Sequence, residues 1–331
     1  MTNDIKRQFQ QLDSHGEDND CYKVLSLPDM SHKLGKSKEN FPVFFVNVAN
    51  TGTHTKNILR EHLSVEYNQM CRIACEGLEE ERNYAILTLR STEWSLQAVF
   101  IDIVSLTLGN LPPIPSCKEI SIEVENLITI FSALDNPPVK KMQGLWGELL
   151  VIAQSKYPET LINAWHNSPS AKFDFTLGRD KIEVKTTSGE NRAHRFSLDQ
   201  LNPSPSSRML IASIIVRESG EGNGGKSIRQ LFEEIMNRVS TTKERLHLHQ
   251  VVAETVGRDF SKIDSTFFDY TEACDTLAYF RAQDIPRIKK QDVPQGVTEV
   301  KFTSQLTDLP EAFSDGRKAD YSQSPLFKSI L

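Results

Sequence analysis

The sequence has no long hydrophobic run, and this absence excludes one class of protein. No stretch approaches the roughly 18 consecutive apolar residues that a helix needs to cross a bilayer. Residues 1–20 are polar and acidic, without the apolar centre of a signal peptide. We therefore expect no association with a membrane and a cytoplasmic location.

Cysteine is scarce, which argues against both a disulfide framework and a zinc site. The chain has five cysteines among 331 residues. Only Cys71 and Cys75 lie close together, and no second Cys or His pair completes the ligand spacing of a zinc site. An odd number of scattered thiols is typical of a protein kept in a reducing compartment.

Several catalytic patterns are missing as well. The sequence contains no G-x-S-x-G elbow and no H-E-x-x-H pair, the signatures of α/β-hydrolases and of many zinc proteases. Its histidines, His166 among them, show no metal-ligand spacing with carboxylates. We therefore expect the catalytic groups of this protein among other residue types.

An overall excess of positive charge is also absent. The net charge is −6 at pH 7, which argues against a basic coat for nucleic acid. Residues 138–217 are the exception, with 11 Lys and Arg against 7 Asp and Glu. A basic stretch between acidic flanks is consistent with a surface that faces phosphates.

The length of 331 residues predicts two or three domains, or one core with substantial additions. Short segments rich in β-branched and aromatic residues, at 41–49, 62–67, 71–75 and 84–90, predict a β-rich N-terminal domain at residues 1–117, available for DNA or partner recognition. Residues 118–240 predict a mixed sheet flanked by helices, and residues 241–331 an α/β region that packs on this core. Helices are expected near residues 94–108, 122–134, 141–155, 227–239 and 243–255, and strands of the core and C-terminal region near 173–177, 181–187, 209–216, 277–282 and 298–302.

Acidic residues and one lysine on two neighbouring strands carry the expected chemistry. Residues two apart on a strand face the same side, so Glu183 and Lys185 share one face of their strand. Across the predicted hairpin, Asp174 comes near Glu183. Two close carboxylates repel unless a cation lies between them, and Mg²⁺ prefers such oxygen ligands. A lysine beside the metal can orient the attacking water and stabilise charge on a phosphate.

An isolated E-x-K tripeptide is weak evidence, because a solvated surface hairpin would contain the same residues. Its surroundings strengthen the interpretation. Asp174 lies between two phenylalanines, and both strands precede an apolar strand. Upstream, Glu148 lies on a predicted helix in which Gly144 and Gly147 allow another backbone to approach closely.

Several motifs stand in order along the chain. They are residues 144–149 (GLWGEL), Trp165, residues 173–175 (FDF), residues 182–187 (IEVKTT), Arg192 with His194, and Ser197 with Gln200 and Leu201. Together these motifs resemble a bacterial family of PD-(D/E)XK nucleases that is often met in restriction and phage-defence gene neighbourhoods. The likeness is specific in residues 144–201 and looser at residues 285–288 and 297–302. Residue 173 is Phe where the motif's name has Pro, which is a frequent variation.

The resemblance implies a restriction-endonuclease-like α/β core and a DNA-cutting activity. It implies that Glu148, Asp174 and Glu183 hold Mg²⁺, for which Mn²⁺ can substitute, and that Lys185 is catalytic. Its implied partners are DNA, a second copy of the chain in a homodimer, and other defence-system proteins.

The residues that follow the E-x-K motif are further candidates. Gln200 can hydrogen-bond a phosphate or the attacking water, and we count it with the catalytic residues. Arg192, His194, Arg195 and Ser197 are candidate contacts to DNA. A helix cap or a solvated loop would account for these four residues as well.

A second motif predicts a different chemistry. Residues 220–227 (GEGNGGKS) match the phosphate-binding pattern G-x-x-x-x-G-K-[ST], in which Lys226 would contact phosphates and Ser227 a Mg²⁺ ion. Too few residues follow to complete an NTPase sheet, and Ser227 as a helix N-cap explains the pattern equally well. The main hypothesis is therefore a Mg²⁺-dependent deoxyribonuclease. A nucleotide-binding regulator, and an inactive nuclease fold that binds DNA or assembles complexes, are the alternatives.

Overall fold

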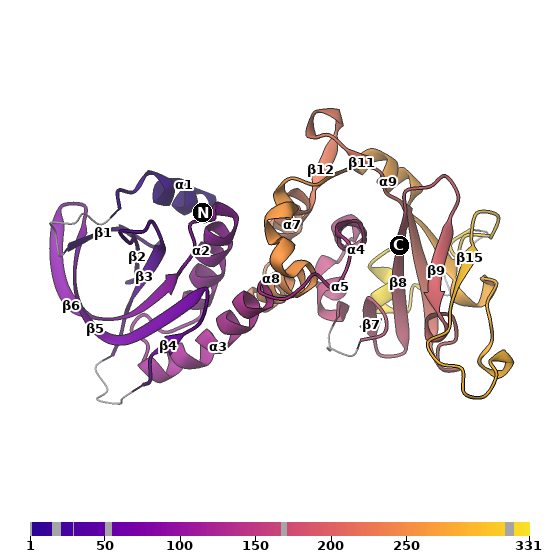
Figure 1. Ribbon diagram of the computed structural model, residues 1–331, viewed down its shortest axis with the longest axis horizontal. Helices are drawn as coiled ribbons and strands as arrows, with labels where there is room; N and C mark the ends of the chain where they lie inside the picture. Colours follow the sequence, from indigo (N-terminus) through magenta and orange to yellow (C-terminus); the bar gives the residue numbers. More distant parts are fainter. Residues whose placement is uncertain (1, 15–20, 29, 50–54, 167–170, 315–320) are drawn as a thin grey trace. The chain divides into compact units, whose positions relative to one another are not determined.

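The computed structural model describes residues 2–14, 21–28, 30–49, 55–166, 171–314 and 321–331 (Figure 1). The chain is a mixed α/β protein with several sheets, and it forms two compact units. The first unit comprises residues 1–138 and 256–261, and the second comprises residues 139–255 and 262–331. The helix at residues 117–133 thus belongs to the first unit. Residues 139–240 share the second unit with most of residues 241–331.

The first unit is built on one sheet, in agreement with the predicted β-rich start of the chain. The strand order is β1-β2-β3-β6-β5-β4, and β1 also pairs in parallel with β5, which closes the sheet on itself. The two expected strands at residues 62–67 and 71–75 form one long strand with an irregularity between Glu66 and Gln69. The strands are β1 (Cys21–Ser26), β2 (Lys33–Lys36), β3 (Pro42–Asn47), β4 (Ile58–Leu59), β5 (Leu63–Cys75) and β6 (Leu78–Leu89).

Three helices accompany this sheet: α1 (Thr2–Gln11), α2 (Trp94–Leu108) and α3 (Cys117–Ala133). The bounds of α2 confirm the prediction. Helix α3 begins at Cys117 rather than at residue 122, because Ser116 and Glu119 form a capping box that satisfies its first N–H groups. The ring of Phe100 in α2 lies edge-on to Phe131 of α3, with 5.7 Å between the centroids, so the helices share a core.

The second unit contains a four-stranded sheet in the order β14-β10-β8-β7. Its four strands and the helices α4, α7 and α8 correspond to predicted elements, whereas the predicted strand near residues 298–302 is displaced to residues 301–305. The strands are β7 (Phe175–Leu177), β8 (Asp180–Thr187), β10 (Arg208–Ile215) and β14 (Ala278–Arg281), and the helices are α4 (Met142–Gln154), α5 (Pro158–Ala164), α6 (Leu198–Leu201), α7 (Ile228–Arg238), α8 (Thr242–Val256), α9 (Tyr270–Thr276) and α11 (Pro325–Lys328).

Strand β10 is a central strand of this sheet, and its side chains are buried on both faces. It runs parallel to β8 and antiparallel to β14, and its residues from Met209 to Ile214 are buried. A strand covered on both faces needs apolar side chains on both faces. The hairpin of β7 and β8 was predicted correctly, and Gly178 takes the left-handed conformation (φ 58°) that its turn requires.

Two smaller sheets and several 3₁₀ helices complete the second unit. No helix in the described parts of the chain is long and apolar enough to span a membrane. The small sheets have the orders β11-β13-β12 and β15-β9, formed by β9 (Ala193–Ser197), β11 (Glu218–Ser219), β12 (Gly225–Ser227), β13 (Phe267–Asp269) and β15 (Lys301–Gln305). Its 3₁₀ helices are η1 (Glu221–Asn223), η3 (Ala282–Asp284) and η4 (Lys290–Asp292), whereas η2 (Gly257–Asp264) begins in the first unit and ends in the second.

Candidate active site

Strand β8 presents a carboxylate and an ammonium group on one face. Glu183 and Lys185 are two residues apart, and the Lys185 Nζ lies 2.6 Å from the Glu183 Oε1. The Lys185 ammonium also lies 5.4 Å from the centroid of the Phe196 ring, so an apolar cluster borders the pair. The Glu183 side chain is 4% exposed, which makes this ion pair a buried feature and not a solvated hairpin.

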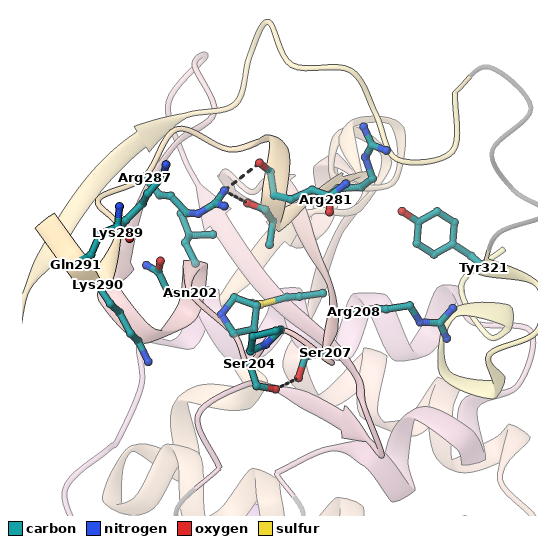
Figure 2. Close-up of a pocket in the computed structure, with 16 residues that line it drawn as sticks. Asn202, Ser204, Ser207, Arg208, Arg281, Arg287, Lys289, Lys290, Gln291 and Tyr321 are labelled. Carbon is teal, nitrogen blue, oxygen red and sulfur yellow. Dashed lines mark hydrogen bonds between the residues drawn. The ribbon is translucent and has the colours of Figure 1, made fainter.

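The hairpin and helix α4 bring two more carboxylates to the same place. Asp174 directly precedes β7, and its Oδ2 accepts a hydrogen bond from the Val184 N–H at 2.8 Å. Glu148 lies on α4, which approaches β8 closely because Gly147 has no side chain facing Thr186. Glu148, Asp174, Glu183 and Lys185 all line one pocket of about 490 Å³. A larger pocket in the same unit, of about 880 Å³, contains none of them (Figure 2).

Lys140 is a site residue that the sequence patterns did not reveal. Its ammonium lies between the two carboxylates, 2.6 Å from the Glu148 Oε1 and 2.7 Å from the Asp174 Oδ1. Lys140 belongs to the segment before α4, where no motif marks it. The only signal in the sequence is the net positive charge of residues 138–217, which does not single out any one lysine.

His166 approaches the carboxylates although it shows no metal-ligand spacing with them along the sequence. Its Nε2 lies 2.9 Å from the Glu148 Oε2 and 3.7 Å from the Asp174 Oδ1. Its backbone has a positive φ of 39°, which is rare for a residue other than glycine, and its N–H donates to the Asp174 carbonyl. Spacing along the chain could not predict this contact, because α5 and the turn after it return the chain to the site.

Burial and the charges of neighbouring side chains strongly shift the pKa values of the carboxyl groups in this pocket. Burial, together with the charge of Asp174, raises the pKa of Glu183 to about 8. Burial also raises the pKa of Asp174, and the charge of Glu148 adds to this effect. Burial opposes ionisation of Glu148, but its hydrogen bond with His166 and the charge of Lys140 outweigh this and lower its pKa to about 2. Such opposed shifts within one pocket are typical of functional sites.

The donor set fits a divalent cation. One ligand atom from each of Glu148, His166 and Asp174 lies within 4.8 Å of the other two. The Glu183 Oε2 is buried and has no hydrogen-bond partner in the described chain. A buried carboxylate oxygen without a partner is costly, and a cation would relieve that cost. The carboxylate oxygens suit Mg²⁺ and Mn²⁺, whereas the imidazole nitrogen suits transition metals better than it suits Mg²⁺.

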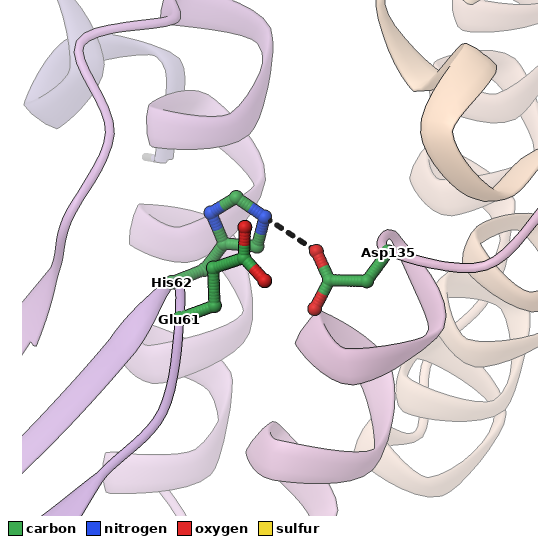
Figure 3. A group of neighbouring side chains, drawn as sticks. All are labelled: Glu61, His62 and Asp135. Carbon is green, nitrogen blue, oxygen red and sulfur yellow. Dashed lines mark hydrogen bonds and ion pairs between the residues drawn. The ribbon is translucent and has the colours of Figure 1, made fainter.

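A second group of metal-ligand side chains lies in the first unit (Figure 3). It consists of Glu61, His62 and Asp135, and the His62 Nε2 lies 2.8 Å from the Asp135 Oδ1. Glu61 and Asp135 are exposed to solvent. Exposed pairs of this kind are common without a metal, so the buried group in the second unit is the stronger candidate.

Gln200 lines the same pocket, beside Glu183 and Lys185. Its Oε1 lies 3.3 Å from the Lys185 Nζ, and its Nε2 donates to the Glu183 Oε1. Ser197 does not face the pocket in the same way. It is the N-cap of α6 and forms a capping box with Gln200, so it positions that amide.

The remaining candidate DNA contacts are mostly turned inward. The Arg192 guanidinium donates to the Ser213 carbonyl at 2.8 Å and also to the Thr276 carbonyl. His194 is buried, it shares a 2.7 Å hydrogen bond with the Ser213 hydroxyl, and burial lowers its pKa to about 4. These contacts give Arg192 and His194 a structural role. Arg195, on the other face of β9, is exposed.

The glycine-rich segment does not form an open phosphate cradle. Gly225, Lys226 and Ser227 form strand β12 and pair with β13. The Lys226 Nζ contacts Glu234 at 2.8 Å and lies 3.5 Å from the centre of the Tyr270 ring. Ser227 caps α7. The backbone and the lysine of this motif are thus engaged within the protein, which favours the structural interpretation.

Comparison with known proteins agrees with this geometry. Searches of the curated proteins and of the solved structures each gave no significant match. One family model, described as "Putative PD-(D/E)XK family member, (DUF4420)", matches residues 6–307, which include every residue of the candidate site. The chain therefore belongs to this PD-(D/E)XK family, whose fold is of the nuclease type.

Proposed function

We propose that the protein is a Mg²⁺-dependent DNA endonuclease that acts in restriction or phage defence. One observation carries the proposal. Glu148, Asp174, Glu183 and Lys185 come from a helix, a loop and a strand, and they line one pocket. Buried carboxylates beside a lysine suit metal-assisted hydrolysis of a phosphodiester better than they suit a purely structural role.

The side chains have distinct tasks in this reaction. Glu148, Asp174 and Glu183 would hold the metal, with His166 as an additional ligand. A metal held by these residues would supply Lewis acidity to the scissile phosphoryl group and to the attacking water. Lys185 stabilises the negative charge that develops on the phosphate. Gln200 fixes the positions of Glu183 and Lys185 through its amide.

We expect in-line attack by water that leaves 5′-phosphate and 3′-hydroxyl ends. Arg195 is the exposed candidate for contact with the DNA backbone. Action as a two-fold homodimer would allow both strands to be cut, and other defence-system proteins are candidate partners.

Plasmid cleavage tests the proposal directly. Wild-type protein should cut DNA with Mg²⁺ or Mn²⁺ and not with EDTA. Asp174→Asn and Lys185→Ala should each lower the rate by at least about 100-fold, because each removes a group that acts on the metal or the phosphate. Circular dichroism and the unfolding midpoint check that both variants are folded.

Lys226→Ala is the matched control, since it removes a lysine of the same unit that lies outside the pocket. It should cut at nearly the wild-type rate. If wild type did not cut DNA but bound a nucleotide, and Lys226→Ala abolished that binding, the nucleotide-binding alternative would replace the nuclease. Binding of DNA without metal-dependent cutting, on modified and unmodified plasmids, would favour the inactive DNA-binding fold.

A further inference from the structure

A second pocket of the nuclease-like unit is larger than the candidate active site and contains none of its residues. Its volume is about 880 Å³. Its walls come from three segments: the loop between α6 and β10, the stretch after β14, and Tyr321 near the C-terminus (Figure 2).

The lining is rich in positive charge and, among the residues that the structure describes, contains no acidic residue. Three of its cations are paired with carboxylates outside the lining. Arg208 makes two 2.7 Å hydrogen bonds to Asp180, Arg281 is paired with Asp284, and the Lys290 Nζ lies 3.0 Å from Asp199. The remaining cations decide what the pocket attracts. They are Arg287 and Lys289, which Figure 2 shows on one side of the pocket.

Arg287 is held in place but is not neutralised. Its Nη1 donates to the carbonyls of Ala282 and Gln283 at 3.2 and 2.9 Å. Its Nε is buried and has no hydrogen-bond partner in the parts of the chain that the structure describes. Carbonyl oxygens position a guanidinium without cancelling its charge, so Arg287 is prepared to bind an anion.

The neutral groups of the pocket also suit an anion with several oxygens. The hydroxyls of Ser204 and Ser207 share a 2.7 Å hydrogen bond on one wall, which leaves one hydroxyl of the pair able to donate into the pocket. The Asn202 amide donates to the carbonyls of Leu198 and Ile288 at 2.8 and 2.9 Å, which ties the two walls together. Arginine, lysine and serine side chains are among the usual contacts to backbone phosphates in protein–DNA complexes.

The pocket adjoins the candidate active site. Asp199 bridges the two, with its Oδ2 2.8 Å from the Lys172 Nζ and its Oδ1 3.0 Å from the Lys290 Nζ. Lys172 lines the active-site pocket, and Lys290 lines the larger one. Gln200 and Leu201, which are consecutive in the chain, line the two pockets in turn. A polymer with evenly spaced negative charges can therefore occupy both.

We propose that the pocket around Arg287 and Lys289 binds phosphates of the DNA strand whose scissile bond lies at Glu183 and Lys185. This inference rests on the proposed nuclease function and adds where the strand runs beyond the cut. The contacts are to the backbone, so they raise affinity for every sequence. A strand that contacts both pockets has a fixed direction across the protein. This helps to orient the phosphate that is cleaved.

Binding to a labelled DNA duplex, measured by fluorescence anisotropy with Ca²⁺ in place of Mg²⁺, tests the proposal apart from turnover. Arg287→Gln and Lys289→Ala should each weaken binding about tenfold at moderate salt. Each should also reduce the slope of log Kd against log salt by about 0.9. Arg287→Lys keeps the charge and should recover part of the affinity. Lys243→Ala, an exposed lysine that lines neither pocket, should behave as wild type.

A small substrate separates this proposal from the function on which it rests. Bis(p-nitrophenyl) phosphate has no strand to reach the second pocket, so Arg287→Gln should hydrolyse it at the wild-type rate while Lys185→Ala does not. Absence of hydrolysis by wild type would count against the nuclease, and the binding results would still report on the pocket. Unchanged affinity and salt slope in both pocket variants would overturn the proposal. Competition by a free mononucleotide as strong as that by the duplex would overturn the assignment to a strand.

Discussion

Lys140 supplies the positive charge between the buried carboxylates of Glu148 and Asp174. Burial alone would lower the pKa of Lys140, but the two carboxylates more than offset this and raise it above its ordinary value. The ammonium thus takes the place between two oxygen ligands that suits a metal cation. A metal and this ammonium would compete for the same negative charge.

Replacing Lys140 by methionine should therefore have opposite effects with and without metal. In EDTA, Lys140→Met should lower the free energy of unfolding by roughly 1–3 kcal/mol, because two buried carboxylates lose their counter-charge. Added Mg²⁺ should then raise the unfolding temperature more than in wild type, because it displaces no ammonium. Thermal unfolding at several Mg²⁺ concentrations measures both effects.

Lys141→Met is the control for this experiment. Lys141 lines the same pocket and makes no ion pair within the described chain. It should change neither the stability in EDTA nor the response to Mg²⁺ by much. A smaller Mg²⁺ response in Lys140→Met than in wild type would mean that Lys140 assists metal binding.

Between elements, the approach of α4 to β8 decides where Glu148 lies. A side-chain carbon at Gly147 would collide with the Thr186 methyl group and would come within 3.6 Å of Val184. The same carbon at Gly144, one turn earlier in the helix, would meet no atom within 4 Å. The two glycines therefore have different reasons to be in the helix, although both were expected to allow a close approach.

Alanine at position 147 should lower the stability of the protein, whereas alanine at position 144 should leave it unchanged or raise it. Gly147→Ala should destabilise the second unit by about 1–3 kcal/mol, because the helix must move away from the sheet. It should also slow metal-dependent cleavage, since Glu148 moves with the helix. Gly144→Ala should be neutral or stabilising by up to about 1 kcal/mol, because alanine favours the helix. Urea unfolding and cleavage rates measure these effects, and equal midpoints for the two variants would contradict the packing argument.

At the scale of the whole molecule, each unit buries a histidine that resists protonation. Burial lowers the pKa of His32 in the first unit and of His194 in the second to about 4. His32 accepts a hydrogen bond from the Asn47 N–H, which requires a neutral ring. The unfolded chain takes up these protons near pH 6.5, whereas the folded chain does not until about pH 4.

Stability should therefore fall in mild acid in both units. The contribution of each histidine is fully present above pH 6.5 and is lost as the pH falls from 6.5 towards 4, by about 1–2 kcal/mol per histidine at pH 5. His32→Gln and His194→Gln should each flatten this dependence, although each changes the stability at pH 7. Urea unfolding between pH 5 and 7.5 measures the slope. A slope as steep in both variants as in wild type would show that other groups cause the loss.

Local patterns in the sequence predict several helices and strands of the second unit and part of the candidate site. The hairpin, helix α4 and the buried strand β10 follow from periodicities and turn residues that act over a few positions. The same local rules place Glu183 and Lys185 on one face of β8 and Asp174 across the hairpin. The family resemblance added Glu148 and Gln200, which local rules alone would not have joined to the strand.

The tertiary fold brings together the groups of the candidate site that are far apart in the sequence, and no local pattern predicts them. Lys140 reaches Asp174 across 34 positions, and His166 reaches Glu148 across 18. Both contacts depend on how α4 packs on the sheet and how α5 returns the chain, and no periodicity encodes that path. The same holds for Arg192, just before β9, and for His194 on β9, which both form hydrogen bonds with Ser213. Which face of an element is covered depends on all of its neighbours at once, so charge and spacing in the sequence could not assign these residues.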